Sequence, residues 1–514
     1  MRWVKDAGSD PSVTAAGEGQ PGRGLRAPPW PVVAAATAGL VVNLDTALNI
    51  ALPAVSDAFD LQVAGITWIV VCYVLTYACL LVTTGRLADA FGHARMVRWG
   101  LALTTVGLAG VGLAPVWGLV LVGRVVQGAG AALILGAAPA LVTTSVPAER
   151  AARALGQFQL GVAVGFAAGP PLGGMLTEWL GWRWVFLFRV PLAAGLALLL
   201  WWRLPRPALP MAKPATPAEP GTPADAAIPA APSTRANPTK SRRAPLDLAG
   251  TLSLGAAVAA GLLALNRGNQ AGWTSPTVLL AAALVVPLAL TWLRVEHRAE
   301  NPALDPALFR SARFSVANGL TAAANGSMFM VWLLSPYYLV TTLGHSTIAG
   351  GFLLAANPAA MALVAPLAGR AAIRWGAGRV ASTGLAIEAC GLAVTSQLSD
   401  RAPAAAVAGA LALVGLGVGL FTVPNMTLVM GSIARDRQGV AGGLSQMTRT
   451  VGVVSGVALG SLALTHLRSG EGRRLGVDAV DQLTFLPAYS TVFLGAAALA
   501  GGAFLVSLTR LRDR

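Results

Sequence analysis

The sequence predicts an all-α integral membrane protein with about fourteen transmembrane helices. Of its 514 residues, 55% are hydrophobic and only 11% are charged, and the mean hydropathy is +0.64. Soluble chains carry about one quarter charged residues, so most of this chain cannot face water. Apolar blocks of roughly 18 to 25 residues recur from Pro31 to the C-terminus, the length that a helix needs to cross about 30 Å of hydrocarbon. Polar and apolar residues do not alternate within the blocks, which disfavours a membrane β-barrel.

The predicted spans follow one another with short connections, except after the sixth. Gly and Ala are abundant within them, as expected where helices approach closely in lipid. In order, the spans cover residues 31–53, 66–85, 97–115, 117–143, 155–177, 184–203, 247–266, 275–294, 315–339, 347–369, 380–398, 404–432, 439–466 and 486–508.

The formal net charge of +15 comes from basic residues scattered among the connections, without the continuous patch that would favour nucleic-acid binding. Most of them follow even-numbered spans, as Arg86, Arg95 and Arg98 do after the second. By the positive-inside rule, we expect both termini to be cytoplasmic. The connection at 467–482, with mixed charges, is an exception. The preference for Arg over Lys, with abundant Ala and Gly, is typical of a GC-rich bacterial genome, so we expect a bacterial inner membrane.

Two long stretches lack apolar blocks. Residues 1–29 are polar and contain no apolar segment of the signal-peptide kind, so we expect a disordered cytoplasmic N-terminus. Residues 204–246 are rich in Pro and Ala with few large apolar side chains, which predicts a cytoplasmic linker between two halves.

Cysteine and histidine give no sign of a metal site, a disulfide or a cofactor. Cys72, Cys79 and Cys390 lie inside predicted spans, where a thiol usually behaves as a small hydrophobic group. The four histidines are too dispersed for metal-ligand spacing.

A tight cytoplasmic turn is predicted after the second span. It runs from Gly85 to Arg95 and contains Asp89 and Gly92; a turn this short needs glycine at its corners. Asp89 can cap a helix N-terminus or pair with an arginine. An ordinary charged loop has a similar composition, so this segment alone decides nothing.

The fifth predicted span carries a glycine repeat. Gly161, Gly165, Gly169 and Gly173 recur every four residues and so line one face of a helix, forming a groove into which another backbone can pack. Pro170 and the proline after it should break this helix locally.

Taken together, these segments resemble the motifs of the major facilitator superfamily. The turn and the glycine repeat flank an arginine motif at Arg124–Gly130, and Leu44–Pro53 is similar to the signature of the fourteen-span drug:proton antiporter family. The chain departs from the family pattern at Ala90 and Ala94, where basic residues are usual, and at Arg189, where Asn is common.

The resemblance implies two six-helix bundles around a central cavity, with the seventh and eighth spans inserted as a hairpin. Trp375–Arg379 partly echoes the first-half turn at the matching place of the second half. The implied division is an N-terminal bundle at 30–203, the linker, a helical hairpin at 247–295, a cytoplasmic connection at 296–314, a C-terminal bundle at 315–509 and a cytoplasmic tail at 510–514.

Asp45 lies a little past the middle of the first span, where a carboxylate is costly unless it is paired, hydrated or protonated. It is a candidate for proton coupling or for binding a cationic substrate, and the alternative is a structural hydrogen bond between helices. Asn49, one turn later on the same face, could share either role.

Arg124 cannot release a proton, but its charge can favour proton release from a nearby acid. The resemblance implies that coupling role, whereas an arginine that only bonds backbone carbonyls at a helix kink is the alternative. Gln127 should lie beside it. Glu388, near the middle of the eleventh span, is a second proton-coupling candidate or an acid kept in a polar pocket for structural reasons. Arg449 should either snorkel or pair across the bundle.

Polar and aromatic side chains within the spans are candidates for a substrate cavity, although packing against lipid would also suit them. They are Asn49, Tyr73, Tyr77, Gln127, Asn325, Trp332 and Asn357.

We therefore expect a monomeric secondary active transporter that exports hydrophobic or cationic small molecules, such as drugs and antibiotics, in exchange for protons by alternating access. In the family that it resembles, the glycine repeat marks exporters. The alternative within transport is a carrier of one specific metabolite. A polytopic membrane enzyme is disfavoured, because the sequence shows no His/Asp constellation, phosphate-binding loop or sizeable soluble domain.

Overall fold

The computed structural model describes residues 30–61, 63–203, 274–298, 311–432, 438–475 and 482–512, with scattered positions between 253 and 268. Every secondary-structure element in these ranges is helical, which confirms the predicted all-α class. Nine helices in the described part are long and apolar enough to cross a membrane. The predicted N-terminal tail and the linker at 204–246 lie outside the described residues.

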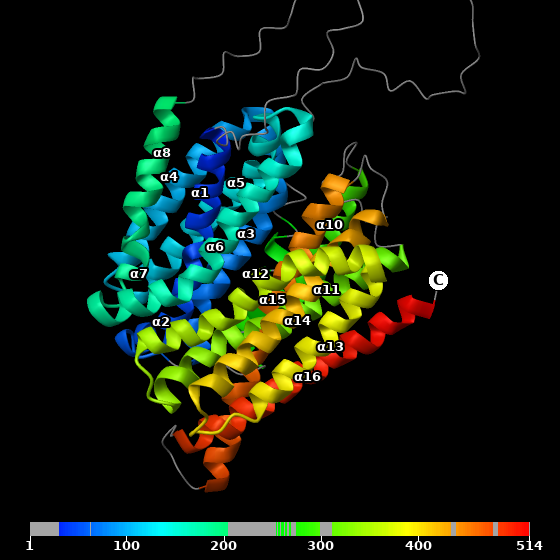
Figure 1. The fold of residues 1–514 in the computed structure, drawn as a ribbon. Helices are drawn as coiled ribbons and strands as arrows, with labels where there is room; N and C mark the ends of the chain where they lie inside the picture. The colour runs from blue at the N-terminus through cyan, green and yellow to red at the C-terminus, as the bar shows by residue number, and fades with distance from the viewer. Residues whose placement is uncertain are drawn as a thin grey trace, which may run out of the picture.

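The first half of the chain forms one group of closely packed helices (Figure 1). A short 3-10 turn, η1, interrupts its first span, and α7 and α8 together cover the sixth. The elements are α1 (Trp30–Asn43), η1 (Leu44–Thr46), α2 (Ala47–Ala58), α3 (Val63–Phe91), α4 (His93–Gly112), α5 (Trp117–Thr144), α6 (Ala148–Leu180), α7 (Trp184–Leu187) and α8 (Arg189–Arg203).

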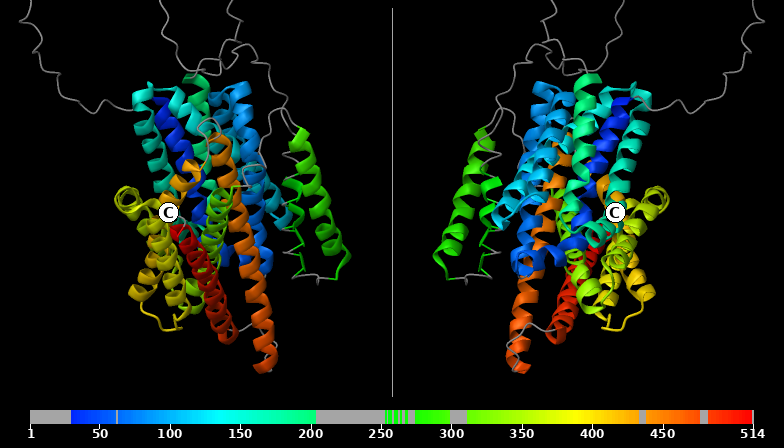
Figure 2. Two further views of the ribbon diagram at one scale, coloured as in Figure 1. Left: turned by 90° about the vertical axis from the view of Figure 1, so that its right-hand side faces the viewer. Right: turned by 90° about the vertical axis from the view of Figure 1, so that its left-hand side faces the viewer.

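The second half forms a second group, in which α11 ends in the π-helical turn η3. Its elements are α11 (Ala312–Tyr337), η3 (Tyr338–Thr342), α12 (Thr347–Trp375), α13 (Ala377–Ser396), α14 (Ala404–Gly431), α15 (Gln438–Leu475) and α16 (Gln482–Arg512). Between the halves in sequence, α10 (Pro276–Arg298) stands at the flank of the other helices in both views of Figure 2. The span predicted at 247–266 falls largely outside the described residues.

The turn after the second span is tighter than expected. Helix α3 continues to Phe91 and α4 begins at His93, so Gly85 lies inside a helix and not at a corner of the turn. Gly92 alone makes the connection, with φ of 96°, a conformation that glycine adopts at little cost. Gly376, with φ of 89°, connects α12 to α13 in the same way. The sequence echo between the halves is therefore a structural echo.

The prediction that Pro170 and Pro171 break their helix was wrong. Helix α6 is continuous from Ala148 to Leu180, with both prolines inside it. A proline removes only its own N–H donor, and other groups can satisfy the carbonyl that this leaves free.

One place where the two halves meet is the crossing of α6 and the beginning of α12. The backbones touch: a Cβ on Gly351 would lie 2.4 Å from the Pro170 carbonyl oxygen, and one on Gly174 would lie 2.3 Å from the Thr347 carbonyl oxygen. Beside them, the exposed Glu178 carboxylate accepts hydrogen bonds from the Thr347 hydroxyl at 3.1 Å and from the Ile348 N–H at 3.0 Å. Glu178 thus belongs to one half and satisfies the first turn of a helix in the other.

Candidate functional site

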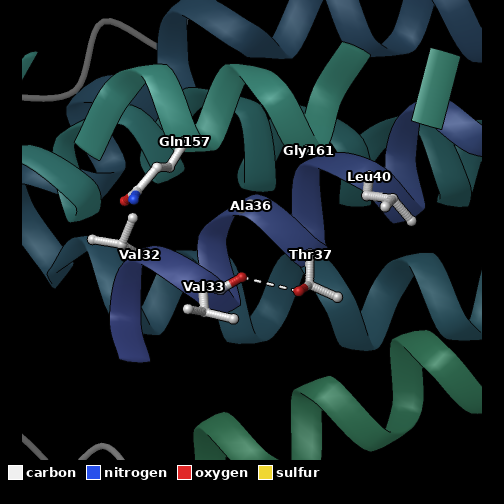
Figure 3. Close-up of a pocket in the computed structure, with 7 residues that line it drawn as sticks. All are labelled: Val32, Val33, Ala36, Thr37, Leu40, Gln157 and Gly161. Carbon is white, nitrogen blue, oxygen red and sulfur yellow. Dashed lines mark hydrogen bonds between the residues drawn. The ribbon is translucent and has the colours of Figure 1, made fainter. Parts of the chain in front are cut away.

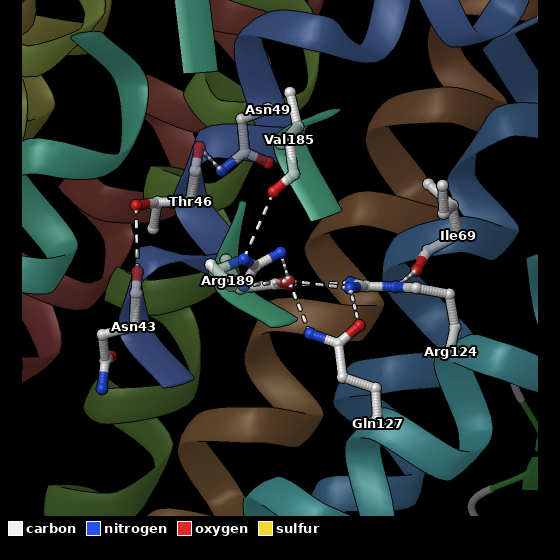
Figure 4. Close-up of polar contacts among 9 residues, drawn as sticks. Asn43, Thr46, Asn49, Ile69, Arg124, Gln127, Val185 and Arg189 are labelled. Atoms are coloured by element: carbon white, nitrogen blue, oxygen red, sulfur yellow. Dashed lines mark hydrogen bonds and ion pairs between the residues drawn. The ribbon is translucent and has the colours of Figure 1, made fainter. Parts of the chain in front are cut away.

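The break in the first span is held by short polar side chains that bond backbone carbonyls (Figure 4). Asn43 Nδ2 donates to the Gly39 oxygen at 2.9 Å, and Asn49 Nδ2 donates to the Thr46 oxygen at 3.2 Å. The Thr46 hydroxyl lies 3.1 Å from the Asn43 oxygen and 3.1 Å from the Phe166 oxygen on α6. Such bonds compete with regular helix, and the resulting turn η1 carries Asp45.

Side chains of Arg124, Gln127 and Arg189 all donate hydrogen bonds to the Asp45 carboxylate, and we call these four residues the Asp45 cluster. The three donor residues are labelled in Figure 4. Arg124 binds the carboxylate with both terminal nitrogens: Nη1 lies 2.8 Å from Oδ1 and Nη2 lies 2.8 Å from Oδ2. Gln127 Nε2 donates to Oδ1 at 2.9 Å. Both terminal nitrogens of Arg189 donate to Oδ1 at 3.1 Å. Two-point contacts between guanidinium and carboxylate are among the strongest hydrogen bonds in proteins.

The Nε donors of both arginines are also used. Arg124 Nε donates to the Ile69 oxygen at 2.7 Å, and Arg189 Nε donates to the Val185 oxygen at 3.3 Å. The Tyr73 ring lies 4.4 Å from the guanidinium carbon of Arg124, a favourable cation–π distance. Arg124 therefore both pairs with an acid and bonds a backbone carbonyl, which the sequence had offered as alternatives.

Exposure and charge distinguish the members of the cluster. The side chains of Arg124 and Arg189 are 1% and 0% exposed, whereas that of Asp45 is 13% exposed. One carboxylate faces two guanidinium groups, so the cluster carries one net positive charge. A proton on Asp45 would leave both arginines without a counter-charge inside the cluster, which costs electrostatic energy.

Arg189 is the cluster member that the sequence reasoning missed. It was noted only as a departure from a family pattern, although a charged residue inside an apolar span is by itself a functional-site signal. Its partner Asp45 lies 144 residues earlier in the chain, a separation at which no local pattern can reveal the pairing.

The groove predicted from the glycine repeat is present, and it is filled by α1, η1 and the start of α2. A Cβ on Gly161 or Gly165 would lie 2.4 Å or 2.5 Å from a carbonyl oxygen of α1. A Cβ on Gly169 would lie 1.9 Å from the Thr46 hydroxyl, and one on Gly173 would lie 2.1 Å from the Ala47 oxygen. The repeat therefore seats the turn that carries Asp45.

Glu388 lies in the other half, away from the Asp45 cluster. It is fully buried between α13, α11 and α14, where the Ser327 hydroxyl donates to its Oε1 at 2.7 Å. Its Oε2 has no hydrogen-bond partner in the described part of the chain. An ionised carboxylate is costly in such surroundings, and one hydroxyl compensates for little of that cost.

The predicted cavity residues have different immediate partners. Tyr73 and Gln127 belong to the Asp45 cluster or touch it, while Trp332 is buried and packs against the Phe166 ring, with 5.2 Å between ring centroids. Asn357 is fully buried and donates to the Leu411 oxygen at 3.2 Å, which ties α12 to α14. Asn325 Oδ1 accepts a hydrogen bond from Arg449 Nε at 3.0 Å.

A shallow hollow between α1 and α6 contains none of these candidates (Figure 3). Its walls are mostly apolar, and the Thr37 hydroxyl within it bonds its own helix at the Val33 oxygen. The lining residues are Val32, Val33, Ala36, Thr37, Leu40, Gln157 and Gly161.

Two remaining candidates lie around the turn at Gly92. Arg95 is half-buried in the first turn of α4, and Asp89 lies in the last turn of α3, with its side chain outside the described part. Among the described residues, no group of three or more His, Cys, Asp or Glu side chains could hold a metal ion.

Known proteins resemble this chain over most of its length. A family model described as Major Facilitator Superfamily matches residues 34–295 and 317–514. Multidrug resistance protein Stp of Mycobacterium tuberculosis (strain CDC 1551 / Oshkosh) is 30% identical over 424 residues, which are 82% of this chain and 73% of that protein. The tetracenomycin C resistance and export protein of Streptomyces glaucescens is 29% identical over 449 residues, covering 85% and 76%.

Two further similarities bear on substrate and fold. Riboflavin transporter RibZ of Clostridioides difficile (strain 630) is 25% identical over 453 residues, which are 87% of this chain and 91% of that protein. The crystal structure of a bacterial homolog to the human lysosomal transporter Spinster, inward-facing and unoccupied, has a TM-score of 0.65 at 15% identity and covers 94% of this chain and 98% of that chain. At this identity, the likeness shows the fold.

Proposed function

This chain belongs to the Major Facilitator Superfamily, and we propose that it exports hydrophobic or cationic compounds, such as drugs and antibiotics, in exchange for protons. It is a multi-pass membrane transporter of small molecules and not an enzyme. The observation that carries this proposal is the two-point contact between Asp45 and Arg124 at the break in the first span. A titratable acid and a permanent cation deep in a membrane are what proton coupling requires.

In this mechanism, a proton on Asp45 weakens the contacts with the Arg124 nitrogens, because a neutral carboxyl group binds a guanidinium less strongly than a carboxylate does. The change is transmitted through packing. Asp45 lies on η1, which is seated in the glycine groove of α6, and the far part of α6 contacts α12 in the other half. Proton binding can thereby bias how the two halves meet, as alternating access needs.

The proposed orientation places both termini in the cytoplasm and the protein, as a monomer, in a bacterial inner membrane. The contact of α6 with α12 then lies at the outward end, because α6 begins near the cytoplasmic side and α12 ends there. A transporter closed at its outward end receives cargo from the cytoplasm, which suits export.

One observation supports export as the direction of transport, and another supports drugs as the cargo. The glycine repeat that marks exporters is complete and packed against the first span, and two of the relatives named above carry resistance to drugs in their names. The resemblance to a riboflavin transporter favours a second candidate, a carrier of one metabolite. The number of unrelated compounds that the protein transports distinguishes a drug exporter from a carrier of one metabolite.

The test is proton-driven uptake of a drug panel into everted membrane vesicles, comparing the native protein with Asp45→Asn. The matched control is Asp400→Asn, which removes an exposed carboxylate outside the cluster. We expect the native protein and Asp400→Asn to accumulate several unrelated compounds, and Asp45→Asn to lose accumulation of all of them. Accumulation of a single compound would favour the metabolite carrier, and full coupling in Asp45→Asn would refute the role of Asp45.

A further inference from the structure

Acids and arginines deep in the two halves are not paired one to one. In the first half, the Asp45 cluster contains one acid and two arginines. In the second half, Arg449 on α15 has no carboxylate partner among the described residues, and Glu388 is engaged only by Ser327. Each half therefore contains one arginine without a carboxylate of its own, which is unusual because an unpaired arginine inside a membrane is costly.

Arg449 has free donors. Its Nε donates to Asn325 Oδ1 at 3.0 Å, while its terminal nitrogens Nη1 and Nη2 have no acceptor in the described part of the chain. The side chain is half-buried. A planar guanidinium group with two free nitrogens matches the geometry of a carboxylate or another flat anion.

Helix α3 brings the basic groups of the two halves together. Tyr73 on this helix lies against the Arg124 guanidinium of the first half. Tyr77, one turn further along the same face, lies within electrostatic range of Arg449 of the second half, and α3 contacts α15 along this interface. The two free terminal nitrogens of Arg449 and the positively charged Asp45 cluster therefore lie next to each other along one face of α3.

We propose that the preferred cargo is a hydrophobic organic anion, a carboxylate or phenolate on an aromatic framework. Arg449 binds this anion through its free nitrogens. Arg189 makes the Asp45 cluster positive and so favours anions over cations. This inference rests on the proposed export function and narrows its substrate class. A lipophilic cation would meet the net positive Asp45 cluster on one side and the Arg449 guanidinium on the other, whereas a flat anion gains contacts with Arg449 and with the neighbouring tyrosine rings.

Anion export is compatible with proton exchange. An anion leaving the cell and a proton entering it move charge in the same direction, so the membrane potential and the pH gradient both drive the cycle. The proton and the anion also bind to different halves of the protein, at Asp45 and at Arg449.

The test uses two xanthene dyes of similar framework and opposite charge, fluorescein and rhodamine 123. Binding to the purified protein is measured by fluorescence polarisation, and transport is measured in everted vesicles. We expect native protein to bind fluorescein at least tenfold more tightly than rhodamine 123. Arg449→Gln should weaken fluorescein binding roughly tenfold, the loss expected for about 1.4 kcal/mol, and Arg449→Lys should weaken it less. Arg189→Asn should raise the affinity for rhodamine 123.

The control is Arg374→Gln, which removes an exposed arginine at the end of α12 and should change neither affinity. Equal binding of both dyes by the native protein, or an unchanged dye preference in Arg449→Gln, would overturn the inference. Fluorescein binding that depends on Arg449 without any transport would support the anion site while contradicting the exporter function. Proton-driven transport of rhodamine 123 but not fluorescein would support the exporter and overturn the anion site.

Discussion

The Thr46 hydroxyl lies 3.1 Å from the carbonyl oxygen of Phe166, the acceptor that would have bonded the N–H of residue 170 if that residue were not a proline. This hydrogen bond benefits both helical segments that it joins. The carbonyl that Pro170 leaves free gains a donor, and the turn that carries Asp45 is fixed to α6. The prolines thus serve the attachment of the first span and do not end the helix.

Removal of this hydroxyl should destabilise the protein. Thr46→Val keeps the shape of the side chain but leaves the Phe166 carbonyl without its donor, so we expect a loss of about 0.6 to 1.5 kcal/mol. The measurement is thermal unfolding of the purified protein. Thr37→Val is the control, because Thr37 bonds only a carbonyl of its own helix. An unchanged Tm for Thr46→Val would show that the contact does not contribute to stability.

The glycine groove should not accept a methyl group in place of its last glycine. Gly173→Ala would place Cβ 2.1 Å from the Ala47 carbonyl oxygen, so the helices must separate, at a cost of about 1 to 3 kcal/mol. Gly156→Ala on the same helix meets nothing within 4 Å and should be neutral. Tm and drug efflux measured on both variants test the groove, which would be dispensable if the two behaved alike.

Arg124 should tolerate no basic substitute. In Arg124→Lys, one ammonium group replaces a fork that reaches both oxygens of Asp45 and the Ile69 carbonyl together, so positive charge is kept while the geometry is lost. We expect proton-driven efflux to fall at least tenfold at unchanged membrane expression. Near-native efflux would mean that charge alone suffices at this position.

Glu178 should hold the two halves together at the α6–α12 contact. Glu178→Gln keeps the length of the side chain but removes the negative charge that accepts hydrogen bonds from Thr347 and Ile348. We expect a larger population of molecules in which α6 and α12 are separated, measured as the distance between spin labels on the two helices. Acidic pH should act in the same direction on the native protein and have less effect on the variant. A pH response of equal size in both would assign it to another group.

Spans were predictable from the sequence because hydropathy and length alone determine them. The block at 117–143 corresponds to α5, Trp117–Thr144, and the block at 404–432 to α14, Ala404–Gly431. The break at η1 was not predictable, since its causes lie in other helices: Thr46 bonds α6, and Asp45 binds arginines on α5 and α8. Asp45 and Arg124 were identified as single residues, but their contact became visible only in the fold.

The connections at Gly92 and Gly376 are as short as a connection between two helices can be. Each is a single residue, and successive residues of a helix are rotated by about 100°. One residue inserted into the first turn of α4 would therefore turn the rest of α4 by that angle and carry Gly107, now against the backbone of Gln127, away from its partner. The same holds for α13 after Gly376, so insertions or deletions at the start of either helix should be poorly tolerated.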